Sequence, residues 1–164
     1  MATIATEPVL PPTPLASDLC WLLARASHAL TTELTFALEG KGITPRDHAV
    51  LATALTGTHT QTELARQVGL DKTTMVVTLD ELEGAGLAER RPSPTDRRVR
   101  VVAVTAAGKR KVREAEAVMD RVREEVLQTL PARDREVFLR ALASLACGRL
   151  SEPVPCSHSV RRRA

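Results

Sequence analysis

Residues 60–83 carry the pattern that decides the fold, and they read TQTELARQVGLDKTTMVVTLDELE. Thr60 and Glu63 stand three positions apart, the spacing of a capping box that starts a short helix. Gly69 ends this helix, and Asp71 can cap a second one. Three apolar residues of the second helix share one face: Met75, Leu79 and Leu82. The stretch therefore predicts two helices joined by a turn of about three residues.

After this pair of helices, the residue pattern changes from helical to β-forming. Residues 87–91 and 99–104 are short runs rich in β-forming residues, and they flank the turn-forming segment Pro-Ser-Pro-Thr-Asp-Arg at residues 92–97. Between Ala88 and Arg113, nine basic residues stand against two acidic ones, although the formal net charge of the whole chain is only +3. The sequence thus predicts a β-hairpin with a basic tip, which suits a polyanionic partner.

Amphipathic helices are predicted on both sides of this centre. Apolar residues recur at a helical period over residues 15–38, and a Thr-Pro start opens a further helix over residues 44–55. After the hairpin, residues 106–130 and 131–148 show the same period. The apolar seam of the first of these favours dimerisation, although it could also pack within one chain. The members of the seam are Val112, Ala115, Met119, Val122, Val126 and Leu130.

Composition favours helices over a β-sandwich. Aromatic residues make up only 2% of the chain, so the core must be built from Leu, Val and Ala, which suits helix packing. We expect a mainly α fold with a small β-wing, in which residues 15–148 form a single domain. Residues 1–14, with four prolines, and residues 149–164 are predicted to be a disordered arm and a disordered basic tail. The domain would consist of dimerisation helices at residues 15–40 and 106–148 and a winged helix-turn-helix at residues 44–105.

The order of helix, glycine-containing turn, helix and basic hairpin is that of a winged helix-turn-helix, which places its second helix in the major groove of duplex DNA. The first residues of that helix must let the backbone approach the base edges, and Lys72, Thr73 and Thr74 meet this requirement. Val76 and Val77 could contact thymine methyl groups. Because the helix contains no Asn, Gln or Arg, wing contacts and DNA shape are expected to matter more than base reading.

The tip of the hairpin is the second part of the predicted DNA interface. Arg97 and Arg98 are placed to reach a minor groove, and Asp96 is predicted to pair with Arg98 and orient its guanidinium. The competing interpretation is an adaptor that binds a protein rather than DNA, since a run of charge can also be a solvated face. The predicted DNA contacts are Thr60, Gln61, Lys72, Thr73, Thr74, Val76, Val77, Arg90, Arg91, Asp96, Arg97 and Arg98.

Four motifs follow one another along the chain: TQTELARQVGL at residues 60–70, Leu-Glu-x-x-Gly-Leu at 82–87, Asp-x-Arg at 96–98 and Val-Thr-x-x-Gly at 104–108. As a set they resemble the MarR family of transcription regulators, over about residues 15–148. The resemblance implies a homodimer whose first and last helices intertwine, with two winged helices that read a palindromic operator in double-stranded DNA. It also implies a small-molecule or oxidant input, and hence a sequence-specific repressor released by an effector.

Two interpretations of the input signal stay open. Cys20 lies in Leu-Cys-Trp-Leu-Leu at residues 19–23, which is similar to the cysteine segment of the family branch that senses organic hydroperoxides. That branch surrounds its cysteine with tyrosines, whereas this chain has no Tyr, so Cys20 is either a redox sensor or a packed core cysteine. The candidates for the wall of a cavity that binds a small amphipathic or phenolic effector are Trp21, Arg25, His28 and His48.

Other classes of protein lack support in the sequence. There is no glycine-rich phosphate loop, nucleophile elbow or cluster of His, Asp and Glu, so we expect neither an enzyme nor a cofactor. Three cysteines are too few for a four-ligand zinc site or a disulfide framework. The first residues lack a signal-peptide pattern, and no apolar run approaches the roughly 20 residues that span a bilayer. We expect a cytoplasmic protein without a membrane partner.

Overall fold

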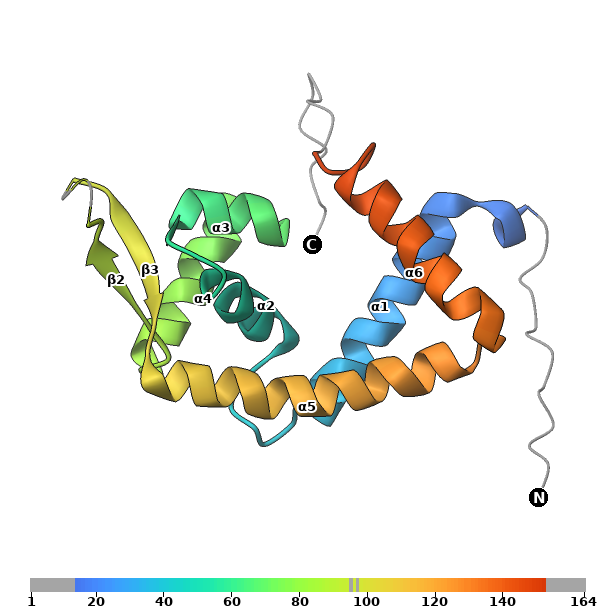
Figure 1. Ribbon diagram of the computed structural model, residues 1–164, viewed down its shortest axis with the longest axis horizontal. Helices are drawn as coiled ribbons and strands as arrows, with labels where there is room; N and C mark the ends of the chain where they lie inside the picture. The colour runs from blue at the N-terminus through green and yellow to red at the C-terminus, as the bar shows by residue number, and fades with distance from the viewer. Residues whose placement is uncertain (1–13, 95, 97, 153–164) are drawn as a thin grey trace. The chain divides into compact units, whose positions relative to one another are not determined.

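Helices account for most of the chain in the computed structural model, which describes residues 14–94, 96 and 98–152 (Figure 1). The helices are the 3₁₀ turn η1 (Leu15–Ser17), α1 (Leu19–Ala37), α2 (Pro45–Ala54), α3 (Gln61–Val68), α4 (Lys72–Gly84), α5 (Ala106–Gln128) and α6 (Ala132–Cys147). The strands β1 (His59–Thr60), β2 (Ala88–Pro92) and β3 (Arg100–Val104) form one antiparallel sheet in the order β1-β3-β2. The predicted mainly α fold with a small β-wing is confirmed.

The described residues fall into two compact units. The first extends to Val122 and contains α1 to α4, the sheet and most of α5. The second starts at Arg123 and contains the end of α5 and α6. The predicted arm before Pro14 and the predicted tail from residue 153 onward lie outside the described residues.

Local hydrogen bonds start and stop the helices of the centre where the sequence predicts. The Thr60 hydroxyl accepts from the Glu63 N–H at 3.2 Å, and the Glu63 carboxylate accepts from the Thr60 N–H at 2.7 Å, which completes the capping box of α3. Gly69 ends α3 with φ +75°, a left-handed conformation that costs a residue with a Cβ more than glycine. The Asp71 side chain accepts from the Thr74 N–H at 2.9 Å and so starts α4.

The first long helix begins four residues later than predicted. Asp18 caps α1 by accepting from the Trp21 N–H at 2.6 Å, and its extended backbone (φ −78°, ψ 107°) separates α1 from η1. The apolar spacing continues through Leu15, which is why the periodicity alone extended the helix too far. An N-cap residue overrides a continuing apolar pattern, because its own backbone cannot be helical.

The core lies between the central helices and α5. Several of its largest fully buried side chains come from α2, α3 and α4: Val50, Leu51, Leu64, Met75 and Leu79. The first four residues of the predicted seam, Val112, Ala115, Met119 and Val122, belong to the same cluster. This part of the seam therefore packs within one chain rather than against a second copy, and it attaches α5 to the centre of the fold.

A short strand that the sequence did not reveal completes the sheet. His59 pairs with Val102 of β3, and Thr60 pairs with Val101. On its other side β3 pairs with β2, so that Arg90 lies opposite Val102. A strand of two residues shows no alternating pattern, which explains why sequence analysis missed it. The sheet joins the start of α3 to the hairpin.

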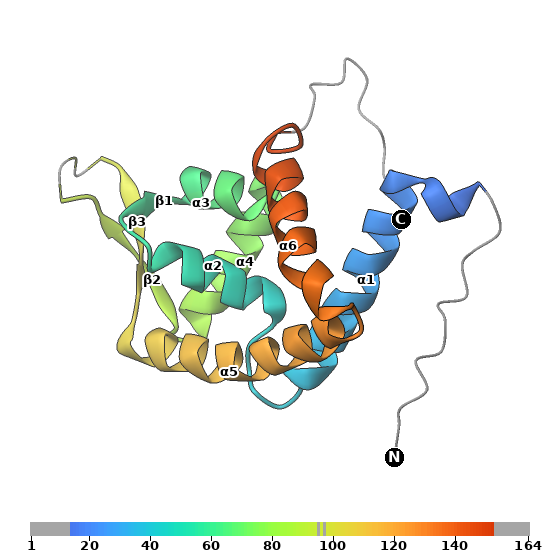
Figure 2. The same ribbon diagram turned by 45° about the vertical axis from the view of Figure 1, so that its right-hand side comes forward.

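A close contact at residues 105–108 joins the hairpin to α5. The Thr105 hydroxyl donates to the Gly86 carbonyl at 2.8 Å and accepts from the Gly108 N–H at 3.0 Å. A Cβ on Gly108 would lie 2.1 Å from the Leu87 carbonyl oxygen, so only glycine fits. The hairpin consequently extends from the N-terminal end of α5 in a defined direction (Figures 1 and 2).

Candidate nucleic-acid interface

The N-terminal half of α4 presents a polar and a buried face, as predicted. Lys72 and Thr73 are exposed and Val77 is 49% exposed, whereas Met75 and Leu79 are fully buried. These exposed side chains are short or flexible, so the backbone of the first two turns is accessible to a groove. Val76 is half-buried.

Two of the predicted DNA contacts, Thr60 and Thr74, form hydrogen bonds at the starts of helices. The Thr74 hydroxyl donates to Asp71 at 2.7 Å, and the Thr60 hydroxyl donates to Glu63 at 2.8 Å. Gln61 is the half-buried first residue of α3. Hydrogen bonds from the backbone and side chain of Thr60 hold the pKa of Glu63 below its ordinary value, and those from Thr74 do the same for Asp71. Both carboxylates thus stay charged at neutral pH and stabilise these helix starts.

The hairpin carries exposed basic residues toward its tip. Arg98 is exposed, and Arg91, with a side chain 61% exposed, pairs with Glu89 of the same strand. Asp96 accepts from the backbone N–H of Arg98 at 2.9 Å, and the described residues show no ion pair between the two side chains. The prediction that Asp96 orients the Arg98 guanidinium is therefore wrong: Asp96 shapes the turn. Arg97 lies outside the described residues.

Arg90 has a different environment from its neighbour Arg91. Its guanidinium contacts the Asp80 carboxylate at 2.8 Å and also pairs with Glu83, and both acids belong to α4. Its side chain is only 24% exposed. The structure thus places this predicted DNA contact between β2 and α4.

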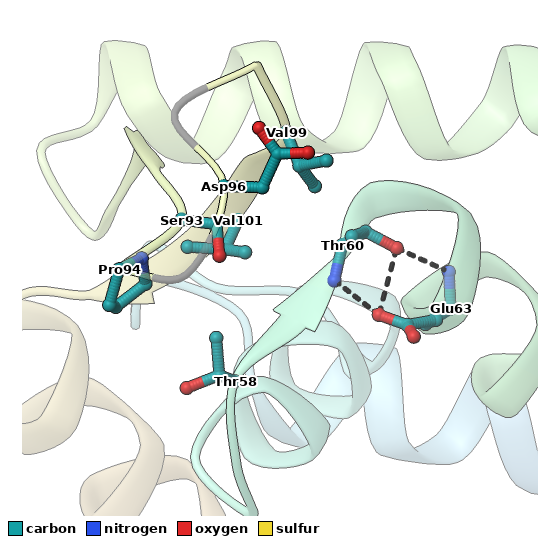
Figure 3. A pocket seen from close by; sticks show the side chains of 8 residues that line it. All are labelled: Thr58, Thr60, Glu63, Ser93, Pro94, Asp96, Val99 and Val101. Atoms are coloured by element: carbon teal, nitrogen blue, oxygen red, sulfur yellow. Dashed lines mark hydrogen bonds between the residues drawn. The ribbon is translucent and has the colours of Figure 1, made fainter.

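A hollow of about 360 Å³ separates the hairpin turn from the start of α3 (Figure 3). Sequence analysis did not anticipate it, because its walls come from two segments far apart in the chain. Glu63 and Asp96 contribute carboxylates to it, so its charge disfavours a phosphate group. The lining residues are Thr58, Thr60, Glu63, Ser93, Pro94, Asp96, Val99 and Val101.

The predicted effector residues lie in two places. Arg25 stacks over the Trp21 ring at 5.4 Å from its centroid on α1, and His28 is exposed on the same helix. His48 of α2 is only 4% exposed and contacts Glu116 of α5. The three residues of α1 lie within about two turns of one another, whereas His48 belongs to a separate helix.

Cys20 is exposed on α1, so it is not packed in the core of the chain. The prediction that Cys20 is a packed core cysteine is therefore wrong for the single chain. Among the residues that the structure describes, no three His, Cys, Asp or Glu side chains gather as a metal site would require. None of the described helices has the length and apolar character needed to cross a membrane.

A helix-turn-helix with an accessible second helix, followed by a basic hairpin, defines a winged-helix DNA-binding protein. The MarR family model matches residues 43–99, which include α2, α3, α4 and β2. The chain belongs to the MarR family of transcription regulators, as the motifs indicated.

Solved structures of the family are similar over most of the chain. The repressor CouR bound to a 23-mer DNA duplex is 30% identical with a TM-score of 0.74, over 84% of this chain and 98% of that one. CouR from Rhodococcus jostii RHA1 bound to p-coumaroyl-CoA is 27% identical with a TM-score of 0.73, over 88% and 99%. A Mycobacterium tuberculosis MarR-family protein in complex with p-aminosalicylic acid is 29% identical with a TM-score of 0.66, over 79% and 99%.

Proposed function

We propose that this chain is a dimeric repressor that binds a palindromic operator through α4 and the hairpin and performs no chemistry of its own. The observation that carries the proposal is the accessible start of α4, with Lys72, Thr73 and Val77 exposed, in a fold that also presents Arg98 on a basic hairpin. The similarity to CouR, whose structure contains a 23-mer DNA duplex, supports it. In a two-fold dimer the two α4 helices would read the two halves of a palindrome.

Binding to duplex DNA from the chain's own upstream region, followed by fluorescence anisotropy over a range of salt concentrations, tests the DNA-binding face. Arg98→Ala should weaken binding to every duplex and reduce the salt slope by about one. Thr73→Ala should instead change the preference among duplexes. Arg133→Ala, a change at an 87% exposed arginine of α6, is the matched control and should have no effect. Equal losses for Arg98 and Arg133 would contradict this face.

Exposed apolar side chains support the dimer. α6 has no buried residue, and Val137 and Phe138 are 53% and 48% exposed. On α1, Leu19 is 55% exposed and Phe36 is 73% exposed. Such a quantity of exposed apolar surface on two helices is typical of an interface with a second copy. Sedimentation equilibrium measures the mass in solution, and a monomer at micromolar concentration would contradict the proposal.

The effector we propose is a small phenolic molecule. The p-coumaroyl and p-aminosalicylic groups named for the two similar structures both contain a phenolic ring. The Trp21 ring with the Arg25 guanidinium over it offers an aromatic surface and a positive charge, which suit an aromatic acid. His48 and His28 remain candidates for polar contacts in the assembled protein.

Trp21 is the single tryptophan of the chain, so its fluorescence reports on this site directly. Titration with p-coumaric acid or p-aminosalicylic acid should quench it and release the DNA duplex, whereas benzoic acid, which lacks the hydroxyl, should be weaker. Arg25→Gln should reduce the affinity for both acids. Arg46→Gln, at an exposed arginine of α2, is the control. DNA release without any change in Trp21 fluorescence would place the effector elsewhere.

The redox alternative rests on the exposure of Cys20 on α1. If Cys20 senses oxidants, cumene hydroperoxide should release DNA from the original chain and not from Cys20→Ser. Equal behaviour of the two proteins would exclude Cys20 as the sensor.

A further inference from the structure

The Arg90 side chain follows one face of α4. Its guanidinium donates to the Val76 carbonyl at 3.4 Å, contacts Asp80 at 2.8 Å and pairs with Glu83. These three residues are spaced by four and then three positions, so they lie one above another on the same face of the helix. A single arginine of the hairpin thus spans about two turns of α4.

Glu83 binds the backbone of Arg90 as well as its side chain. One carboxylate oxygen accepts from the Arg90 N–H and the other from the guanidinium. Arg90 also pairs with Val102 in the middle of the β2–β3 ladder, so this contact fixes the centre of the hairpin rather than its end. A residue held at both its backbone and its side chain has little freedom to turn toward a ligand.

The neighbouring arginine shows the opposite arrangement. Successive side chains of a strand point to opposite faces, and Arg91 is 61% exposed where Arg90 is 24% exposed. Arg91 pairs with Glu89 in its own strand, and among the described residues this ion pair connects it to no other element. Position in the strand therefore separates an arginine directed at α4 from one directed at solvent.

The charges around Arg90 matter for DNA binding. Asp80 lies one turn after Val76 on α4, and its side chain is 61% exposed. Without Arg90, both Asp80 and Glu83 would be uncompensated negative charges close to the helix that approaches a polyanion. Arg90 offsets them and leaves the start of α4 free for contact.

We propose that Arg90 is a positioning residue for DNA binding: by joining Glu83 and Asp80 of α4 to the middle of β2, it sets the angle between the hairpin and α4. A fixed angle lets the hairpin tip and α4 meet the same DNA duplex without an entropy cost at binding. This inference rests on the proposed DNA-binding face. It replaces the expectation that Arg90 itself contacts DNA.

Removal of Glu83 separates the two roles by the sign of the effect. If Arg90 contacted phosphate, Glu83→Ala would free the guanidinium and strengthen DNA binding. If Arg90 is a positioning residue, Glu83→Ala weakens binding, by about ten-fold, although it removes a negative charge. Glu81→Ala is the matched control, since Glu81 is exposed on the same helix and the change in charge is identical. Binding by Glu83→Ala as tight as by Glu81→Ala overturns the proposal.

A double-mutant cycle gives a second measurement. Because Arg90 acts through the hairpin, Arg98→Ala should cost much less affinity in an Arg90→Ala background than in the original chain. Additive losses would mean two independent phosphate contacts and would contradict the proposal. Arg90→Lys keeps the charge but not the planar fork that reaches three partners, so it should lose most of the affinity too. Full affinity in Arg90→Lys would also overturn it.

DNA binding by the original chain distinguishes failure of the proposed function from failure of the positioning role of Arg90. If the chain itself binds no DNA duplex, the proposed function fails before any variant is compared. If it binds and Glu83→Ala strengthens the complex, only the positioning role of Arg90 fails. Circular dichroism of each variant establishes that its helices are intact.

Discussion

The winged-helix region, residues 45–104, and helix α6 differ in where their apolar side chains lie. In the first, Leu51, Leu64 and Leu79 are fully buried within the chain. In α6 no residue is buried, and Phe138 is 48% exposed. Burying a leucine contributes about 1.5–3 kcal/mol, so these side chains stabilise the fold of the single chain. The difference teaches that folding stability and assembly depend on separate parts of this chain. A substitution can therefore weaken one without the other.

The largest expected effect concerns the core of the winged-helix region. Leu79→Ala should lower the free energy of unfolding by about 2–5 kcal/mol, because it leaves a cavity beside fully packed neighbours. Val77→Ala on the same helix should change it by less than about 0.5 kcal/mol, since Val77 is 49% exposed. Urea unfolding followed by circular dichroism measures both. Equal losses would mean that the two faces of α4 are not distinct.

A substitution at Gly108 tests the contact between the hairpin and α5. Gly108→Ala places a Cβ 2.1 Å from the Leu87 carbonyl oxygen, so we expect a loss of about 1–3 kcal/mol in stability and weaker DNA binding. Gly84→Ala is the control, because a Cβ there meets nothing within 4 Å. It should be neutral or stabilise α4 by up to about 1 kcal/mol. Thermal unfolding measures the stability of both variants. Equal midpoints for Gly108→Ala and Gly84→Ala would contradict a close contact at Gly108.

A change on α6 should act on assembly and not on folding. Phe138→Ala should weaken the dimer by about 1–2 kcal/mol while the free energy of unfolding of the winged-helix region is preserved. Glu136→Ala, at an 88% exposed residue of the same helix, should leave the dimer unchanged. Sedimentation equilibrium measures the first quantity, and urea unfolding at fixed concentration the second. If Phe138→Ala destabilises the winged-helix region as much as Leu79→Ala does, the two parts are not separable.

The smallest effect concerns acid pH. The hydrogen bonds from Thr74 hold the pKa of Asp71 below its ordinary value of 3.8, so Asp71 contributes stability that is present above this value and is lost as the pH falls through the lower, folded-state pKa. Asn also caps helices, so Asp71→Asn should cost little at neutral pH and make unfolding less dependent on pH below about 4. Unfolding midpoints measured from neutral to acid pH check the sign. A steeper acid dependence in the variant would contradict it.

Much of the centre of the fold could be predicted, because its signals are local. Thr60, Gly69 and Asp71 act on backbone groups within three or four positions of themselves, and these spacings can be read directly from the chain. The alternation of Met75 and Leu79 with exposed neighbours is equally local. The family itself followed from such motifs.

The candidate site was predicted less completely. Lys72, Thr73, Val77 and Arg98 are exposed as expected, but Arg90 pairs with α4. A strand position predicts that two adjacent arginines point apart, and it does not say which of the two faces a neighbouring helix. The hollow beside the hairpin was not predicted either, because its walls come from two segments far apart in the chain.

The sequence by itself determined the start and stop of α3 and the start of α4, the basic hairpin and the family, since each depends on residues a few positions apart. Only the tertiary structure decided that the seam through Val112 and Met119 packs inside the chain and that Glu83 meets Arg90. These outcomes depend on which elements become neighbours. That is settled by burial of apolar surface over the whole core, a property that no short stretch of sequence contains.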